Sequence, residues 1–416
     1  MDGSGRGRAD LVKYKNFSAK VVTFVEMKRS FADILAGLDS DRARKVVSKL
    51  PEWAAAGAEI PSALALEQCS SAATARYKAA LAASCGAEAG MKVLDLTGGL
   101  GVDSRAFSQV AGRVVYYERN AELAAAAERN FARLGAGNIE VRCETVTPDT
   151  ELPEADLIYA DPARRDAAGR KVFLLEDCTP DILTLLPMLL RKAPAVLLKL
   201  SPMADLTMLA ERLGPALREI HVVESGGEVK ELLCLLSAER SSAEPEIVVV
   251  RLSGQAAAAA PPAPDTVLSF RLSEEREAEA AYAAGVESGD VLLEPCPALL
   301  KAGAFRLPCA RWGFLKLAPS THLYLLPGAN LASSAPGIIC DEATPWFKAR
   351  RICDVLPFGA AAFKELKRRC PKAEITARNL PLGSDALRKK MGIAPGGDTH
   401  IFGCALADGS AVLIVT

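Results

Sequence analysis

The stretch Val93-Leu94-Asp95-Leu96-Thr97-Gly98-Gly99-Leu100-Gly101-Val102-Asp103 decides the fold. An apolar strand runs into a glycine-rich turn, and the residues after the turn have the pattern of a helix. Bare backbone at such a turn lets a ligand come close, and the start of the following helix presents free N–H groups. The stretch therefore predicts a nucleotide-like ligand at the carboxyl end of a strand.

Short apolar runs continue after this turn, and helical patterns separate the earlier ones. Parallel strands require such crossover connections, so the alternation predicts a parallel sheet covered by helices. The clearest helix follows the second run, with Asn120 as its N-cap and Gly135 at its C-terminal end. We expect an α/β domain over residues 91–253, with strands at 92–96, 114–118, 139–143, 157–160, 196–200, 221–224 and 231–237.

Two further regions flank this domain. Residues 1–90 are expected to be helical, because apolar residues recur three and four apart around Phe31–Leu38 and residues 72–83 are rich in alanine. Residues 253–264, SGQAAAAAPPAP, predict a linker. Residues 265–416 then form a smaller α+β domain, whose last part predicts a helix at 360–370, a strand at 374–377, a helix capped by Ser384, and strands at 399–406 and 411–415.

Composition excludes several classes of protein. The chain has 416 residues and a net charge of −1, which predicts two or three domains and argues against a uniformly basic nucleic-acid coat. The eleven cysteines include no CxxC pair, so we expect reduced thiols, a cytoplasmic location and no metal site. The first ten residues have no apolar segment, so we expect no signal peptide and no membrane association.

The near-zero net charge hides a basic region. Residues 290–416 carry sixteen Lys and Arg against ten Asp and Glu, a net charge of +6. Phosphate contacts need clustered Lys and Arg, so this region is the candidate surface for binding the phosphates of a nucleic acid. For any single cation, a solvated helix face is the alternative. The candidate residues lie on the two expected helices: Lys364, Lys367, Arg368, Arg388 and Lys389.

The spacing Asp95-x-x-x-Gly99-x-Gly101 distinguishes two nucleotide folds. A dinucleotide fold favours GxGxxG, but Ser104 stands at the third position. The spacing instead resembles the first motif of class I S-adenosylmethionine-dependent methyltransferases. The resemblance implies that Asp95 helps to hold the amino-acid end of S-adenosylmethionine, that Glu118 accepts hydrogen bonds from the ribose hydroxyls, and that Glu144 contacts the adenine. Thr97, Gly99, Gly101 and Asp103 complete the expected cofactor set.

A second motif follows the strand at 157–160. Asp161-Pro162-Ala163-Arg164-Arg165 stands where doubly wound folds place reacting groups, and it resembles the fourth motif of the same family. We expect Asp161 to orient the methyl acceptor and Arg164 or Arg165 to bind a phosphate, with Pro162 in the same catalytic motif. A turn with solvated arginines is the alternative.

Two differences from the motifs of related enzymes limit which methyl-transfer reactions we expect. Enzymes that methylate exocyclic amines often have Asp-Pro-Pro-aromatic, whereas Ala163 and Arg164 stand here, which puts methylation of a base amino group in doubt. RNA 5-methyluridine methyltransferases have Asp-Pro-x-Arg but need a nucleophilic Cys at the end of the fifth strand. This chain has Lys199-Leu200-Ser201-Pro202 there, so we expect no covalent enzyme intermediate.

The layout over residues 45–416 resembles a bacterial family of class I methyltransferases with a helical N-terminal segment and a THUMP-like C-terminal domain. Further matches stand at residues 300–305 and 387–393. The resemblance implies a doubly wound Rossmann-like methyltransferase sheet and an RNA substrate, with tRNA favoured. Two alternatives remain: an RNA-binding protein that binds S-adenosylmethionine without transferring its methyl group, and a nicotinamide-dependent oxidoreductase.

Overall fold

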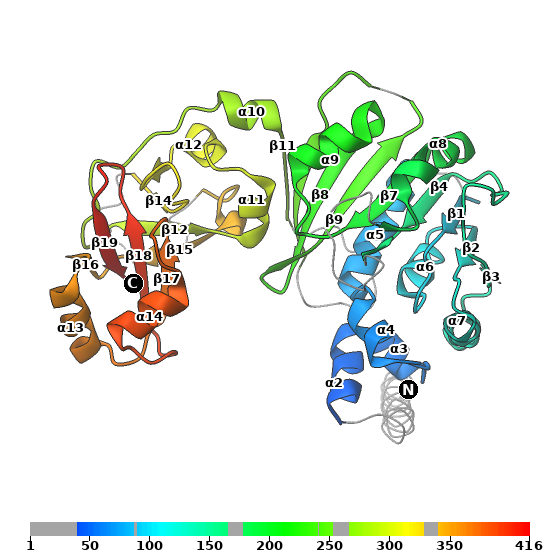
Figure 1. Cartoon of the computed structure of the whole chain (residues 1–416), viewed down its shortest axis with the longest axis horizontal. Helices are drawn as coiled ribbons and strands as arrows, with labels where there is room; N and C mark the ends of the chain where they lie inside the picture. The colour runs from blue at the N-terminus through cyan, green and yellow to red at the C-terminus, as the bar shows by residue number, and fades with distance from the viewer. Residues whose placement is uncertain (1–39, 87–89, 165–177, 240, 253–265, 328–339) are drawn as a thin grey trace, which may run out of the picture. The chain divides into compact units, whose positions relative to one another are not determined.

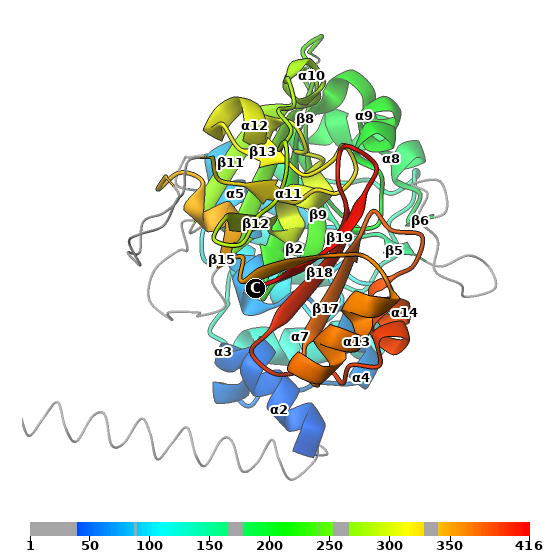
Figure 2. The ribbon, with the colours of Figure 1, turned by 90° about the vertical axis from the view of Figure 1, so that its left-hand side faces the viewer.

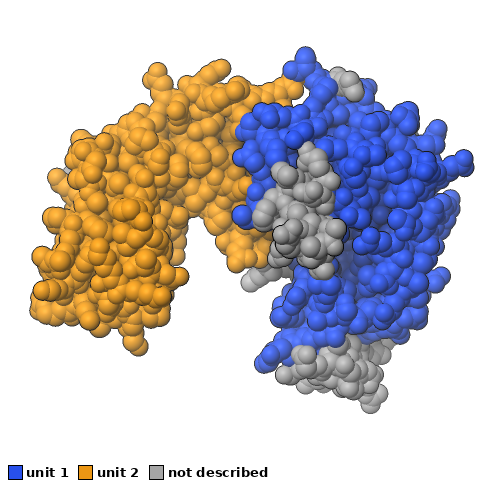
Figure 3. All heavy atoms as spheres, in the orientation of Figure 1, with its two compact units in different colours: residues 1–218, 232–242, 252–265 blue, residues 219–231, 243–251, 266–416 orange. Residues whose placement is uncertain are grey.

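We describe a computed structural model of the chain over residues 40–86, 90–164, 178–239, 241–252, 266–327 and 340–416. The expected linker at 253–264 and the first 39 residues lie outside these ranges. The chain divides into two compact units (Figure 3): unit 1 comprises residues 1–218, 232–242 and 252–265, and unit 2 comprises residues 219–231, 243–251 and 266–416. No helix in the described ranges has the length and apolar character that crossing a membrane requires.

The described part of the N-terminal segment contains helices and no strand, as expected. Its helices are α2 (Ser40–Lys49), α3 (Pro51–Ala55), α4 (Ala63–Gln68) and α5 (Ala72–Cys85). Side-chain caps fix where two of them begin. Ser62 accepts a hydrogen bond from the Ala65 amide, and Ser71 forms a capping box with Thr74 at the start of α5.

The predicted parallel sheet is present. Its strands are hydrogen-bonded in the order β11-β10-β8-β9-β7-β4-β1-β2-β3. The five strands from β7 to β3 in this order are parallel, and β9 joins β7 in the antiparallel sense. The bounds are β1 (Lys92–Asp95), β2 (Arg113–Tyr117), β3 (Ile139–Arg142), β4 (Leu157–Ala160), β7 (Ala195–Leu200), β8 (Leu217–Ser225), β9 (Glu228–Ser237), β10 (Glu246–Leu252) and β11 (Thr266–Arg271).

The connections make this sheet doubly wound. From β1 the chain moves through β2 to β3 at one edge, whereas from β4 it moves to β7 in the opposite direction. Right-handed crossovers therefore place α6 and α7 on one face and α8 on the other (Figure 1). The strand order therefore reverses between the neighbouring strands β1 and β4. Doubly wound folds bind their ligands at this point, beyond the carboxyl ends of the strands. The helices are α6 (Val102–Phe107), α7 (Ala121–Arg133), α8 (Ile182–Lys192) and α9 (Leu206–Leu213), with a 3-10 turn at Gly214–Ala216 and a short pair of strands, β5 (Ala163–Arg164) and β6 (Cys178–Thr179).

Unit 2 contains two four-stranded sheets, so the α+β expectation for the C-terminal region is confirmed. The first has the order β13-β14-β12-β15 and the second β16-β19-β18-β17. The first comprises β12 (Val291–Pro295), β13 (Leu315–Lys316), β14 (Tyr324–Leu325) and β15 (Phe347–Arg351), with α10 (Leu272–Glu277), α11 (Pro297–Ala302), α12 (Leu307–Trp312) and a 3-10 turn (Thr344–Trp346). The second comprises β16 (Asp354–Pro357), α13 (Ala360–Arg369), β17 (Glu374–Arg378), α14 (Ser384–Met391), β18 (His400–Ala405) and β19 (Ala411–Val415).

Alternating residues give the second sheet two apolar faces. Ile401 and Leu413 pack in a core with Leu366 of α13 and Leu387 of α14, and Figure 2 shows these helices beside β17–β19. The neighbouring residues Phe402 and Ile414 point the other way, into a core with residues such as Leu292 of the first sheet. The second sheet is therefore covered on one side by helices and on the other by the first sheet.

One expected cap is wrong. Ser384 is the first residue of α14 and not its N-cap, which is Gly383 without a side-chain cap bond. The Ser384 hydroxyl instead accepts a hydrogen bond from the Ala377 amide at 3.0 Å. It therefore ties the helix to β17, a partner that local sequence does not reveal.

Candidate functional site

Four polar side chains lie in a row at the carboxyl edge of the parallel sheet. Asp95 is in register with Tyr116 and Tyr159, and Tyr159 with Leu197. Because neighbouring parallel strands stay in step, the residues two positions further on are also neighbours. That row is Glu118, Thr97, Asp161 and Lys199, in the order of strands β2, β1, β4 and β7.

The glycine turn is packed from beneath and open outside. A Cβ atom on Gly98 would lie 2.0 Å from the Tyr116 ring, and one on Gly101 would lie 2.6 Å from the Phe131 ring. Gly99, at φ +56°, has only a Thr97 backbone oxygen within 4 Å of that position, at 3.8 Å. The Tyr116 hydroxyl donates to the Gly99 carbonyl at 2.6 Å. Aromatic rings thus fix the inner side of the turn and leave the backbone of Gly99 open to a ligand.

The expected ribose acid, Glu118, lies directly beside this turn. Its Oε2 accepts a hydrogen bond from the Gly99 amide at 2.9 Å, and its Oε1 accepts one from the Asn120 amide at 2.8 Å. Each carboxylate oxygen keeps a further acceptor position, and the side chain is partly exposed. The exposed Glu144 donates its amide to the Glu118 carbonyl at 3.1 Å, so both acids lie at the same end of the sheet.

Asp95 lies beneath the turn and is 1% exposed. Its Oδ2 accepts from the Ser104 hydroxyl at 2.6 Å and its Oδ1 from the Thr97 amide at 3.1 Å. Burial raises the pKa of Asp95 to about 7, although the bonds from Ser104 and Thr97 favour the ionised form. Asp95 therefore connects the glycine turn to α6 from the inside.

Asp103, on α6, forms a buried charge cluster with α5. Its Oδ2 accepts from the hydroxyls of Ser70 and Tyr159, both at 2.8 Å. The Nζ of Lys78, which is 0% exposed, lies 3.4 Å from Oδ1. Burial alone would raise the pKa of Asp103, but the charges of Lys78 and Lys199 and the two hydroxyls hold it below its usual value. Lys78 is not among the site residues expected from sequence, where its only signal is a cation within an alanine-rich helix.

The second motif follows β4 directly. The Asp161 amide donates to Thr97 Oγ1 at 2.6 Å, and its Oδ2 accepts a hydrogen bond from the Lys199 ammonium. The Asp161 side chain is 31% exposed and that of Lys199 is 13% exposed. Pro162 is buried, the backbone of Arg164 is in β5, and Arg165 lies outside the described residues. Lys199 is the functional candidate that sequence reasoning missed, because only its position at a strand end marks it.

The five expected RNA-binding residues lie in unit 2 on α13 and α14. Lys364, Arg368 and Lys389 are exposed. The Lys367 ammonium lies 2.9 Å from where a Cβ of Gly392 would be, at the C-terminal end of α14. Arg388 pairs with Asp385 at 3.1 Å. Within the part of the chain that the structure describes, Lys364, Arg368 and Lys389 therefore form no ion pair, whereas Lys367 lies against the end of α14 and Arg388 pairs within it.

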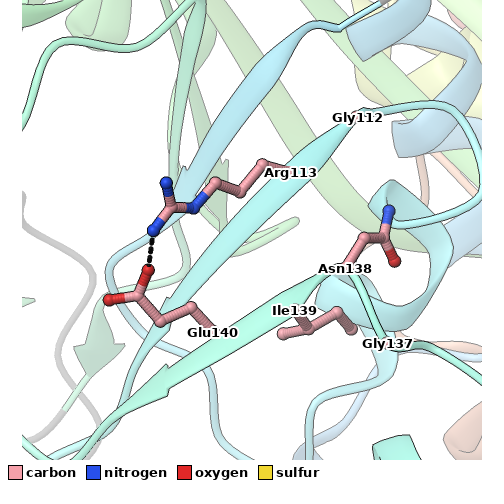
Figure 4. A pocket seen from close by; sticks show the side chains of 6 residues that line it. All are labelled: Gly112, Arg113, Gly137, Asn138, Ile139 and Glu140. Atoms are coloured by element: carbon pink, nitrogen blue, oxygen red, sulfur yellow. Dashed lines mark hydrogen bonds and ion pairs between the residues drawn. The ribbon is translucent and has the colours of Figure 1, made fainter.

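A pocket lies at the other end of the strands, where the parallel strands begin. It is lined by residues at the amino ends of β2 and β3, where Arg113 pairs with Glu140 (Figure 4). None of the expected cofactor or catalytic residues lines it. Across the described ranges, no group of three or more metal-ligating side chains lies close together.

The doubly wound sheet, the glycine turn after β1 and the acids at the carboxyl ends of β1, β2 and β4 define a class I methyltransferase. The crystal structure of a Porphyromonas gingivalis W83 protein, itself provisionally assigned as a methyltransferase, matches with a TM-score of 0.74. The two sequences are 32% identical, and the match covers 94% of this chain and 97% of that chain. This chain belongs to the same family, class I methyltransferases with a THUMP-like C-terminal domain.

Other comparisons concern parts of the chain. Residues 292–328 match a ferredoxin-like domain family, and residues 348–416 match a THUMP domain-like family. An rRNA methylase from Streptococcus thermophilus matches over 39% of this chain and 93% of its own, at 11% identity and a TM-score of 0.30. The tRNA (m1A58) methyltransferase TrmI from Aquifex aeolicus matches over 44% and 74%, at 15% identity and a TM-score of 0.30. No curated protein matches this chain.

Proposed function

We propose that this protein transfers a methyl group from S-adenosylmethionine to a nucleotide in RNA, with tRNA favoured, and without a covalent enzyme intermediate. The observation that carries the proposal is the row Glu118, Thr97, Asp161 and Lys199 at one edge of the sheet. It brings the expected cofactor residues and the expected acceptor-binding residue to the same place. Residues 91–253 are the proposed catalytic domain, and residues 265–416 the proposed RNA-binding domain.

The residues at this edge fit S-adenosylmethionine. The open backbone at Gly99 allows close approach, and Glu118 keeps acceptor positions for two ribose hydroxyls. Glu144 is exposed beside Glu118 for the adenine, while Asp95, Thr97, Gly101 and Asp103 hold the turn and the start of α6. When bound, the cofactor supplies an electrophilic methyl group.

Asp161 and Lys199 would position the acceptor. The Lys199 ammonium occupies Oδ2 of Asp161, which leaves Oδ1 to accept a hydrogen bond from an N–H or O–H of the target nucleotide. A fixed carboxylate of this kind aligns the acceptor with the methyl group, and alignment alone can supply a large part of the rate enhancement. Pro162 begins the turn into β5, and Arg164 or Arg165 is proposed to bind a phosphate of the substrate.

The RNA partner is supported by the THUMP-like match at residues 348–416 and by the net charge of +6 over residues 290–416. Lys364, Lys367 and Arg368 on α13, with Arg388 and Lys389 on α14, are the proposed contacts to phosphates. The absence of paired cysteines in the sequence supports a cytoplasmic location.

The test is transfer of labelled methyl from S-adenosylmethionine to a tRNA fraction. Asp161→Ala is expected to keep cofactor affinity within about twofold and to lose transfer by roughly a hundredfold or more. Retained transfer in this variant would refute the role of Asp161. Cofactor binding by the wild type with no transfer to any RNA would instead favour the binding protein, an alternative motivated by Ala163 and Arg164 in place of Pro and an aromatic residue.

A further inference from the structure

A group of cations lies where the two sheets of unit 2 face each other. On β15, Lys348 and Arg350 share one strand face, and Glu294 of β12 is directly opposite Lys348. On the second sheet, Arg378 of β17 is in register with Cys404 of β18, so it shares a face with Phe402 and His400. Leu292 and Phe402 pack in a common core, which brings these two faces together.

The positive charges in this group exceed the negative ones. Glu294 is the acid paired with both arginines, at 3.5 Å from Arg350 and 3.7 Å from Arg378. Both distances exceed those of ordinary N–H···O hydrogen bonds. Glu374 lies in register with His400 on the same face, but its Oε1 accepts a hydrogen bond from the Gly396 amide at 3.0 Å. Among the described residues, Glu294 is thus the one carboxylate shared by this group, opposite Lys348 and paired with Arg350 and Arg378.

The two guanidinium groups have donors that their long ion pairs with Glu294 do not satisfy. Among the described residues, neither Arg350 nor Arg378 donates a side-chain hydrogen bond, and both Nε atoms are buried without a partner. Each guanidinium has five N–H donors, and leaving buried donors unsatisfied is costly. The side chains remain reachable, because that of Arg350 is 18% exposed and that of Arg378 is 34% exposed. An anion with several oxygens would satisfy these donors.

Aromatic contacts hold this arrangement in place. The His400 ring stacks on Phe402 with a centroid distance of 4.1 Å, and the Arg350 guanidinium lies 5.6 Å from the centroid of the same ring. Thr376 Oγ1 lies 2.7 Å from His400 Nε2. Burial and the charges of Arg350, Lys348 and Arg378 lower the pKa of His400 to about 4, so the ring is neutral at pH 7 and adds no charge.

We propose that Arg350 and Arg378, together with Lys348, form a phosphate-binding site between the two sheets of unit 2. The tetrahedral oxygens of a phosphate group accept from forked guanidinium donors better than from a point charge, which suits two arginines. The phosphate is either an internal phosphodiester of RNA or a terminal or free phosphate. Its assignment to RNA rests on the proposed function, whereas the site itself does not.

The first test uses inorganic phosphate and the full-length protein. The chain has three histidines, so the ring proton of His400 can be assigned by NMR with a His400→Gln variant. Phosphate is expected to shift this signal and to raise the pKa of His400, because the anion offsets the nearby positive charge. Arg378→Ala should weaken phosphate binding about tenfold or more, and Arg378→Lys should weaken it less.

The matched control is Arg351→Ala. Arg351 follows Arg350 on β15, is exposed and lies on the opposite face of the strand. Its loss should change phosphate affinity less than twofold. Equal phosphate affinity in Arg378→Ala and Arg351→Ala, with both variants folded by circular dichroism, would overturn the proposal. Arg350→Lys is a second variant, which keeps the positive charge and removes the forked guanidinium. Unchanged phosphate affinity in both Arg350→Lys and Arg378→Ala would also overturn the proposal.

Short RNA oligomers with and without a 5′ phosphate distinguish the two sources of the phosphate, the RNA backbone and a terminal phosphate. Tighter binding of the phosphorylated oligomer assigns the site to a terminal phosphate, and equal binding that Arg378→Ala weakens assigns it to the RNA backbone. Both outcomes support the site. Phosphate binding that depends on Arg378, without any RNA binding, would keep the site and remove RNA from the proposed function. Cofactor binding in unit 1, measured in parallel, distinguishes failure of the proposed methyl transfer from failure of this site.

Discussion

At the scale of single residues, the buried pair of Lys78 and Asp103 has the largest expected effect on stability. Lys78 is fully buried, and Asp103 is buried among Ser70, Tyr159 and the lysine. Lys78→Met should lower the free energy of unfolding by about 3–5 kcal/mol, because it leaves a buried carboxylate without its cation. Urea denaturation measures this loss.

The control for this prediction is Lys45→Met. Lys45 pairs with Glu67 at 3.7 Å, and both side chains are more than 60% exposed. Exposed pairs of this kind contribute little, so the free energy of unfolding should change by less than about 1 kcal/mol. Equal effects of the two substitutions would contradict a stabilising role for the buried pair.

The free energy of unfolding is expected to depend on pH through the titration of Asp95. Burial raises its pKa from 3.8 to about 7, so between these values the folded state holds a proton that the unfolded state releases. The contribution is fully present below pH 3.8 and is lost as the pH rises towards 7. Asp95→Asn removes this titration, so its stability relative to the wild type should improve between pH 5 and pH 7, by up to about 1.4 kcal/mol per pH unit.

Urea denaturation of both proteins at pH 5, 6, 7 and 8 checks this prediction. Asp103, whose pKa is lowered from 3.8, is ionised in both proteins throughout this range and therefore adds no pH dependence to the difference. A difference in stability that stays constant from pH 5 to pH 8 would show that Asp95 is ionised throughout this range.

At the scale of elements, the glycine turn is held by the rings beneath it. A methyl group on Gly98 would overlap the Tyr116 ring, so Gly98→Ala should lower the free energy of unfolding by about 1–3 kcal/mol and weaken cofactor binding. Gly137→Ala is the matched control, because nothing lies within 4 Å of its Cβ position. Thermal unfolding and calorimetry measure both effects. A Gly98→Ala protein as stable as Gly137→Ala would contradict the packing described for this turn.

The strands of the parallel sheet could be predicted from sequence, because each is a short apolar run bounded by turn residues. Asp95, Glu118, Thr97 and Asp161 could also be predicted to lie near one edge, because strand ends are local features. The side chains that bind these acids could not be predicted. Lys199 meets Asp161, and Lys78 meets Asp103, through the register of separate elements, which no local pattern encodes.

In the C-terminal sheets, too, local sequence predicts some elements but not how they pair. The helix at 360–369 and the strands at 400–405 and 411–415 follow their sequence patterns, whereas β16 was not predicted. β16 has only four residues, and its identity as a strand comes from pairing with β19. Arg350 and Arg378 likewise appear in sequence as two of sixteen cations, and only the packing of two sheets brings them together.

At the scale of the whole molecule, charge is unevenly divided along the chain. Residues 290–416 carry +6 and the rest of the chain −7. RNA binding through this region should weaken with salt, because it releases counterions from phosphates. Replacing Lys364, Arg368 and Lys389 by Ala should reduce the slope of log affinity against log salt concentration by about 2, given roughly 0.7 for each single-strand contact.

Filter binding at several salt concentrations measures this slope, and cofactor affinity in unit 1 serves as the internal control. The three replaced residues are exposed, so the fold should be preserved. An unchanged slope would show that these cations face solvent and do not contact RNA.

The central claim, that the edge formed by Gly99, Glu118, Thr97 and Asp161 binds S-adenosylmethionine, is tested most directly by calorimetric titration. The wild type, Glu118→Ala and Asp161→Ala are each titrated with S-adenosylmethionine and, separately, with NAD. We predict binding of S-adenosylmethionine in preference to NAD, weakened about tenfold or more by Glu118→Ala and changed little by Asp161→Ala. Folded wild-type protein that binds NAD instead, or that binds S-adenosylmethionine equally well without Glu118, would contradict the account.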